Sequence, residues 1–155
     1  LSLFFNSEIS TFLQSKDNYK LNTMQAYISI NFSKRKQFEY VVKAISKTLT
    51  THNISPFVFV DQYNFAISQE KEMMENVMKD IKSSVILIAE TSEKGIGIGV
   101  EVGYAKALGK PVIYLRNQLA EHSTTVAGIS DYQLIYKDED DLIDQLQQIL
   151  AKIQI

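Results

Sequence analysis

The 155-residue sequence contains no cysteine, and its only two histidines, His52 and His122, lie far apart in the chain. The lack of cysteine excludes disulfides, thiol catalysis and cysteine-ligated metals together. It also agrees with a reducing compartment, so we expect a cytoplasmic protein. Two separated histidines do not form the ligand cluster of a zinc site, and we expect neither a metal nor a cofactor.

Strong charge and long apolar runs are also absent. The formal net charge is −2 and the isoelectric point is near 5.7, which argues against a general binder of nucleic acid or of anionic membranes. No apolar run approaches the roughly 20 residues of a membrane span. The hydrophobic content of 45% and the charged content of 22% are those of an ordinary globular domain with a real core.

Residues 1–23 differ from the rest of the chain, because they contain no glycine or proline and are rich in polar residues. They lack a basic start followed by a compact apolar region, which argues against a secretory signal. One helical face is formed by Phe5, Ile9, Phe12 and Leu13. Because Met24 stands directly before the first predicted strand, we interpret 1–23 as an N-terminal extension, either a packed helix or an appended tail, and 24–155 as the domain.

From Gln25 onward, strand-like and helix-like patterns alternate. Runs of β-branched and aromatic residues predict strands at 26–30, 56–60, 85–89, 111–115 and 132–136. Apolar stripes with helical spacing predict helices at 38–49, 74–81, 101–108 and 142–153. This alternation predicts an α/β, flavodoxin-like (Rossmann-like) three-layer fold, with a five-stranded parallel sheet of order 2-1-3-4-5.

In such sheets, ligands bind beyond the carboxyl ends of the strands, near the switch between strands 1 and 3. Three segments are predicted to meet at that edge: 29–32, 61–64 and 90–101. The residues that they bring to this edge include Ser29, Ile30, Asn31, Asp61 and Glu90.

The segment Gly95-Ile96-Gly97-Ile98-Gly99-Val100-Glu101-Val102-Gly103-Tyr104-Ala105 follows the third strand. We interpret it as a loop of small residues that opens a helix from Glu101 to Leu108. Glycines at alternate positions let the backbone approach a ligand and turn its amides outward. Glu101 would lie in the first helical turn, where the helix dipole favours an ionised carboxylate. We expect the apolar face of this helix to be formed by Val100, Gly103, Tyr104, Ala107 and Leu108, with the small Gly103 and Ala107 allowing close packing on the sheet.

The spacing alone leaves two interpretations of this segment. It is not the dinucleotide fingerprint, because Val102 stands where the third glycine belongs, and it is not a Gly-Lys-Ser/Thr phosphate loop. Either Gly95, Gly97 and Gly99 form only a tight turn, with Glu101 stabilising the helix start, or they bind a phosphorylated substrate that Glu101 attacks.

Other polar side chains have both a functional and a structural interpretation. Glu90 either binds a ligand hydroxyl or base, or is a solvated strand end. Ser123 either donates to a phosphate or belongs to a polar loop. Asp61 and Tyr63 have the same two options at the end of the second strand. Asn76 and Asp80 lie beside the apolar stripe of the second helix, as ligand-binding or plain surface residues.

Three segments together resemble the nucleoside 2-deoxyribosyltransferase superfamily. They are Ser84-Val85-Ile86-Leu87-Ile88-Ala89-Glu90, Gly97-Ile98-Gly99-Val100-Glu101-Val102-Gly103-Tyr104-Ala105 and Ala107-Leu108-Gly109-Lys110-Pro111-Val112-Ile113. The Gly-x-Gly-x-Glu-x-Gly form is most similar to the branch of deoxynucleoside 5′-monophosphate N-glycosidases. The resemblance covers residues 25–150 and is specific over 84–113.

The resemblance implies cleavage or transfer at the N-glycosidic bond of a (deoxy)nucleoside or its 5′-monophosphate. In the family, the residue that matches Glu101 is the nucleophile at the anomeric carbon. The acidic residue that matches Glu90 helps to hold the substrate. The resemblance also implies a homodimer or higher homo-oligomer, because family sites borrow residues across subunits, and it implies no nucleic acid polymer or membrane as a partner.

The hydrolase branch binds the 5′-phosphate with small residues that match Gly95, Gly97 and Gly99, and with a serine of a neighbouring subunit that Ser123 matches. The segment Ser29-Ile30-Asn31 resembles that branch's substrate-binding turn.

Two departures from the family pattern bear on activity. Asn76 stands where the family usually has an aspartate that assists the leaving base, and the nearest carboxylate is Asp80, one helical turn later. An asparagine can hold a base by hydrogen bonds but cannot shuttle a proton. Gly95 also replaces a serine. The alternatives are therefore a non-catalytic nucleotide-binding or sensing module, or a TIR-like NAD hydrolase, which shares the strand-helix alternation and a catalytic glutamate.

Overall fold

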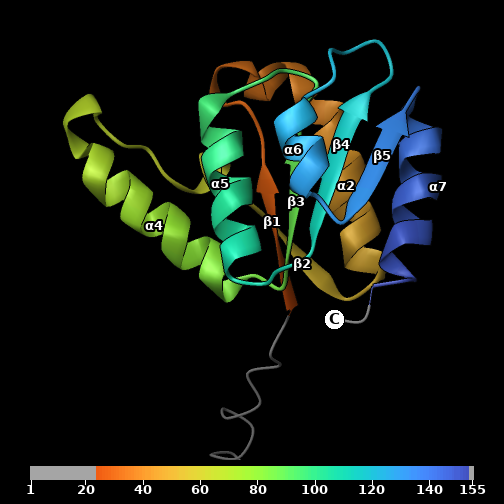
Figure 1. Ribbon diagram of the computed structural model, residues 1–155, viewed down its shortest axis with the longest axis horizontal. Coiled ribbons are helices and arrows are strands. Elements are labelled where there is room, and N and C mark those ends of the chain that lie inside the picture. Colours follow the sequence, from red (N-terminus) through yellow and green to blue (C-terminus); the bar gives the residue numbers. More distant parts are fainter. Residues whose placement is uncertain (1–23, 154–155) are drawn as a thin grey trace, which may run out of the picture.

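The computed structural model describes residues 24–153, so the extension predicted at 1–23, with its amphipathic segment, lies outside the described residues. The described chain forms three layers, with a parallel sheet between two layers of helices (Figure 1). The strands are β1 (Met24–Ser29), β2 (Ile54–Val58), β3 (Ile86–Glu90), β4 (Val112–Asn117) and β5 (Tyr132–Tyr136). Their order is β2-β1-β3-β4-β5, which confirms the predicted topology.

The connections between strands form the two outer layers. The helices that cover the sheet are α2 (Glu39–Thr51), α4 (Glu70–Ser83), α5 (Ile96–Ala107), α6 (Thr124–Ile129) and α7 (Glu139–Leu150). Three further helical segments are η1 (Phe32–Phe38), α3 (Phe59–Gln62) and η2 (Ile67–Gln69). Within residues 24–153, no helix is both long enough and apolar enough to cross a membrane.

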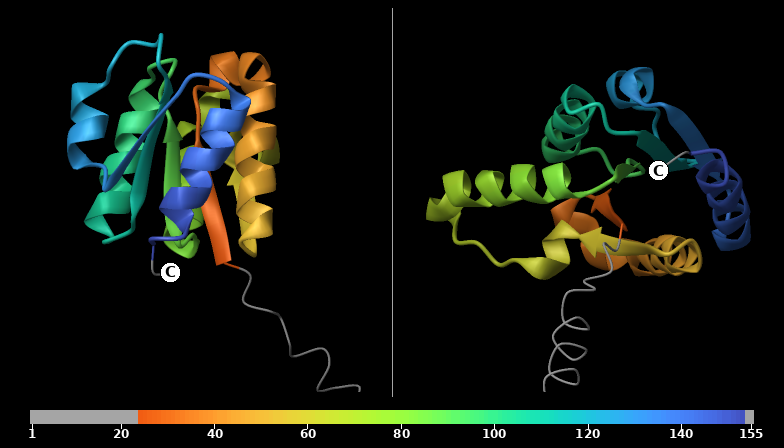
Figure 2. Two further views of the ribbon diagram at one scale, coloured as in Figure 1. Left: turned by 90° about the vertical axis from the view of Figure 1, so that its right-hand side faces the viewer. Right: turned by 90° about the horizontal axis from the view of Figure 1, so that it is seen from below.

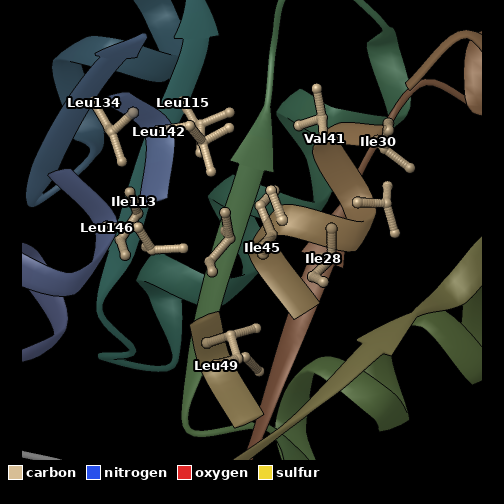
Figure 3. Close-up of a cluster of buried hydrophobic side chains, with 14 of the residues drawn as sticks. Ile28, Ile30, Val41, Ile45, Leu49, Ile113, Leu115, Leu134, Leu142 and Leu146 are labelled. Atoms are coloured by element: carbon tan, nitrogen blue, oxygen red, sulfur yellow. The ribbon is translucent and has the colours of Figure 1, made fainter. Parts of the chain in front are cut away.

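The two faces of the sheet carry separate buried clusters. Helices α2 and α7 cover one face, where Ile45 and Leu146 pack on Ile28 and Ile113 of the strands (Figure 3). Helices α4, α5 and α6 cover the other face, and the views of Figure 2 show the sheet between the two helix layers. Because neighbouring residues of a strand point to opposite faces, each buried strand supplies both clusters.

Helix α5 differs from its prediction, because it begins at Ile96 rather than at Glu101. Gly97 and Gly99 therefore lie inside its first turns instead of in a preceding loop. Glycine disfavours a helix by about 1 kcal/mol per residue. The burial of Ile98 and Val102 against the sheet outweighs that cost.

The predicted apolar face of this helix is also wrong. Val100 and Leu108 were expected to face the core, but their exposed fractions are 49% and 39%. Gly103 and Ala107 lie on the exposed side as well, so they do not let the helix approach the sheet. The buried stripe is instead formed by Ile98, Val102 and Ala105.

Candidate active site

Glu101 lies in the second turn of α5, and its side chain reaches back over β1. The hydroxyl of Tyr27 donates a hydrogen bond to Oε1 at 3.2 Å, and the hydroxyl of Ser29 donates to Oε2. Tyr27 and Ser29 are two residues apart in β1, so strand alternation places both on the α5 face. Each carboxylate oxygen therefore has its own hydroxyl donor.

Burial, rather than the helix dipole, dominates the electrostatics of Glu101. Desolvation raises the pKa of its carboxyl above the ordinary glutamate value, while the hydrogen bonds from Ser29 and Tyr27 oppose that rise. Glu101 was predicted to lie in the first turn of its helix, but α5 begins at Ile96, so Glu101 lies in the second turn. Burial, followed by the nearby charge of Glu101, raises the pKa of Tyr27, so Tyr27 remains a protonated donor.

Glu101 enters a cavity of about 390 Å³ at the carboxyl edge of the sheet. The start of α5 contributes Gly95, Gly97 and Ile98, and the end of β1 contributes Ile30 and Asn31. Most of the remaining wall is apolar or aromatic and comprises Phe32, Phe59, Val60, Tyr63, Phe65, Met73, Met74 and Val77. A cavity of this size with a few polar groups is typical of a small-molecule site.

A second cavity, of about 340 Å³, lies on the other side of the start of α5. Gly95 lines both cavities, and the second also contains Lys94 and Ser123. The backbone amide of Ser123 donates to the hydroxyl of buried Tyr114 at 3.0 Å, which fixes the loop before α6. Ser123 and Gly95 thus line the same cavity within one chain.

The turn after β1 is built by Asn31. Its side-chain amide donates to the carbonyl oxygen of Lys94 at 2.9 Å, and its carbonyl oxygen accepts from the backbone amide of Ser33 at 3.0 Å. Asn31 therefore joins the start of η1 to the loop before α5. The predicted substrate-binding turn thus lies at the Glu101 cavity.

Glu90 lies on the opposite face of the sheet from Glu101. Ile86 and Ile88 of β3 belong to the cluster beneath α2 and α7, and alternation sends Glu90 to the same side. The hydroxyl of Tyr136, a member of that cluster, donates to Glu90 at 3.3 Å. Glu90 does not line the Glu101 cavity, so the structure does not bring these two predicted site residues together.

The fully buried Glu90 is held by the turn that follows it. The backbone amide of Ser92 donates to Glu90 at 3.2 Å, and the Ser92 hydroxyl donates as well. Burial raises the pKa of Glu90 to about 7, against the opposing effect of these hydrogen bonds. The Ser92 hydroxyl also accepts from the backbone amide of Asn117 at 2.7 Å, so the cluster joins the ends of β3 and β4.

Asn76 and Asp80 lie one turn apart on α4, and Asp80 is hydrogen-bonded to Tyr63 of the cavity wall. The Asn76 side chain donates to the carbonyl oxygen of Glu72 at 2.9 Å. Asn76 does not line the cavity, whereas the next residue, Val77, does. Asp80 is buried and accepts a hydrogen bond from the hydroxyl of Tyr63 at 2.9 Å. Asp80 is therefore not a plain surface residue, and it reaches the cavity through Tyr63.

Asp61 and Gly99 also lie outside the cavity lining. Asp61 forms a bidentate ion pair with Arg35 of η1, with a shortest distance of 2.7 Å. Gly99 lies on α5 but does not line the cavity. Sequence reasoning missed Tyr27, for which the spacing of Tyr27 and Ser29 in one strand was the available signal. Tyr63, which was named beside Asp61 at the end of the second strand, does line the cavity.

A family model described as nucleoside 2-deoxyribosyltransferase matches residues 29–148, which include the Glu101 cavity and the whole sheet beyond β1. The chain belongs to the nucleoside 2-deoxyribosyltransferase family. This confirms the family that the three sequence segments resemble. Cleavage or transfer at an N-glycosidic bond is the reaction class that this family supports.

One relative of the family comes from Thermofilum pendens and is described as 2′-deoxynucleoside 5′-phosphate N-hydrolase 1. It is 33% identical over 85 residues, which are 52% of this chain and 59% of the relative. The match thus spans somewhat over half the length of that relative.

Two solved structures share the family's fold. A CMP N-glycosidase from Clostridium botulinum has a TM-score of 0.58 at 17% identity, over 80% of this chain and 98% of that one. A 2-deoxyribosyltransferase from Bacillus psychrosaccharolyticus has a TM-score of 0.61 at 16% identity, over 77% of this chain and 90% of that one. At these identities the likeness is one of fold.

Proposed function

We propose that the protein breaks the N-glycosidic bond of a deoxynucleoside or deoxynucleoside 5′-monophosphate, with Glu101 as the nucleophile. The observation that carries this proposal is the geometry of Glu101. Its carboxylate enters a cavity of small-molecule size, and separate hydroxyls of Tyr27 and Ser29 hold its two oxygens. Family membership supports the reaction class.

Cleavage of an N-glycosidic bond develops positive charge on C1′ and the ring oxygen, as in glycoside hydrolysis. In the proposed step, one oxygen of Glu101 forms a bond to C1′ while the bond between C1′ and the base nitrogen breaks. The base leaves with that electron pair and takes a proton from solvent or a hydrogen-bonded donor. The sugar ester on Glu101 is then attacked by water, which gives a hydrolase, or by a second base, which gives a transferase.

The hydroxyls of Tyr27 and Ser29 support this step in two ways. They favour the ionised carboxylate that the reaction needs, against the desolvation that raises the pKa of Glu101. They also fix the direction of the carboxylate, because each oxygen has a separate donor. A pre-oriented nucleophile lowers the entropic part of the barrier.

The 5′-phosphate is proposed to bind where the two cavities meet. Gly95 lines both, and the first amides of α5 have no carbonyl partner within the helix. Such amides bind anions, and Lys94 and Ser123 from the second cavity add a cation and a hydroxyl. Lys94 already pairs with Glu121 at 3.0 Å, so phosphate would compete with that ion pair.

The proposed test is release of free base from a panel of nucleosides and 5′-monophosphates. Glu101→Gln should lower kcat/KM by about 10³-fold or more, because glutamine cannot form the glycosyl ester. Lys106→Ala on the same helix, whose side chain pairs with Asp131, serves as the matched control and should keep wild-type turnover. Bound nucleotide without turnover by the wild-type protein would instead favour a sensing module.

A further inference from the structure

Tyr63 lies in the wall of the Glu101 cavity within a cluster of three aromatic rings. Its ring centroid is 4.9 Å from that of Phe59 and 5.4 Å from that of Phe65. All three residues line the cavity. Rings packed in this way have a fixed direction, and they offer the kind of apolar wall on which a nucleobase stacks.

The hydroxyl hydrogen of Tyr63 is already engaged in a hydrogen bond. It is donated to Oδ2 of Asp80 at 2.9 Å, and Asp80 is only 8% exposed behind the cavity wall. An ionised carboxylate can only accept, so Asp80 fixes the orientation of this hydrogen. A ligand in the cavity that reaches the hydroxyl oxygen of Tyr63 then finds only lone pairs there. Toward such a ligand, Tyr63 acts only as a hydrogen-bond acceptor.

The other polar side chains of the cavity have different roles or no fixed polarity. Asn31 is engaged with Lys94 and Ser33, and Glu101 with its two hydroxyl donors. Asn64 also lines the cavity, but a side-chain amide offers both a donor and an acceptor and so discriminates little between bases. Tyr63 is therefore the group with a defined polarity.

We infer that the hydroxyl oxygen of Tyr63, oriented by Asp80, selects nucleobases that carry an exocyclic amino group, such as cytosine and adenine, over their oxo counterparts uracil and hypoxanthine. This inference rests on the proposed function, because it assigns the base subsite of that reaction. Tyr63 contacts the base, whereas Asp80 is a positioning residue that acts through it. An oxo group placed against the Tyr63 oxygen would leave two acceptors facing each other.

The amide analogue of Asp80 provides the sharpest variant. In Asp80→Asn, the side-chain NH₂ can donate to the Tyr63 oxygen, which frees the Tyr63 hydrogen to point into the cavity. The selectivity should then move toward oxo bases. Tyr63→Phe removes both the hydrogen-bond donor and the acceptor, so the preference between amino and oxo bases should disappear. Lys79→Ala, an exposed neighbour of Asp80 on α4, is the matched control.

The experiment compares kcat/KM for deoxycytidine against deoxyuridine and for deoxyadenosine against deoxyinosine, each as nucleoside and 5′-monophosphate. The wild-type protein and Lys79→Ala should favour the amino member by about 10-fold, the effect of one well-placed hydrogen bond. That ratio should fall to about 1 in Tyr63→Phe and should fall or invert in Asp80→Asn. Far-UV circular dichroism and thermal melting verify that each variant is folded.

The outcomes separate this inference from the proposed function. Cleavage by the wild-type protein with ratios that Tyr63→Phe and Asp80→Asn leave unchanged would overturn the inference and keep the function. Absence of cleavage across the panel would overturn the function, and calorimetric binding of the free bases would then decide the inference. Tighter binding of cytosine than of uracil, lost in Tyr63→Phe, would support it, and equal or absent binding would overturn it.

Discussion

At the residue scale, the central feature is a buried carboxylate that depends on two hydroxyl groups. Burial alone would favour the neutral form of Glu101, and a neutral carboxyl is a poor nucleophile. Ser29 and Tyr27 oppose that effect from the neighbouring strand. The two hydroxyls are therefore part of the proposed reaction, although neither would bond to the sugar.

Ser29→Ala tests this dependence through the pH profile. The pKa of Glu101 is raised by burial and lowered by Ser29, so removal of Ser29 should raise it further. Because only the ionised form attacks, kcat/KM should fall as pH decreases through that pKa. The acid limb should therefore move to higher pH in the variant, by about one pH unit for one hydrogen bond to a charged group.

Ser92→Ala is the matched control for this profile. Ser92 donates to Glu90 on the other face of the sheet, and burial raises the pKa of Glu90 to about 7. If Glu101 sets the acid limb, Ser92→Ala should leave it in place. A limb that moves in Ser92→Ala and not in Ser29→Ala would assign it to Glu90 and contradict the account.

At the element scale, α5 is a helix whose glycines do not require glycine's backbone freedom. Gly103 has helical geometry, it is exposed, and an added Cβ would meet nothing within 4 Å. Gly109 differs, because it ends the helix with a φ of +71°. The two positions therefore respond oppositely to the same substitution.

Gly103→Ala should increase the free energy of unfolding by about 0.5–1 kcal/mol, because alanine has less backbone freedom to lose. Gly109→Ala should decrease it by about 1 kcal/mol, because the left-handed backbone strains any residue with a Cβ. Urea unfolding at a protein concentration low enough for the chain to sediment as a monomer measures both values. Destabilisation of that monomer by Gly103→Ala would contradict the prediction.

The outer face of α5 also bears on assembly. A helix that is apolar on all sides is usually buried, yet Ile96 is 91% exposed and Val100 is 49% exposed. We propose that a second copy of the chain covers this face, in a homodimer or higher homo-oligomer. Sedimentation of the wild-type protein should then show an oligomer, and Val100→Lys should weaken it at least about 10-fold, because a charge would be buried. A monomeric wild-type protein would contradict this proposal.

At the scale of the whole molecule, the sequence sufficed for the layer order, the sheet order and the edge on which the cavity lies. Those follow from the alternation of apolar strands and helices, and from the rule that ligands bind at the switch point. The segment from Gly95 to Ala105 also predicted that Gly95 and Glu101 lie at that edge. These two residues do line one cavity with Ile30 and Asn31.

The sequence did not predict on which face of the sheet each side chain lies. β1 and β3 are apolar on both sides, so alternation does not tell which set of side chains meets α5. Glu90 and Glu101 were therefore grouped at one edge, although the sheet separates them. The start of α5 was missed because glycine has low helix propensity, and the burial of Ile98, which overrides it, is a tertiary effect.

The most direct test of the central claim is the covalent state of Glu101 during turnover. The wild-type protein would be quenched with acid within milliseconds of mixing with a cleaved substrate, digested and analysed by mass spectrometry. We predict a sugar adduct on the peptide that contains Glu101, and its absence in Glu101→Gln. A sugar adduct on another residue, or base release by Glu101→Gln at the wild-type rate, would contradict the assignment.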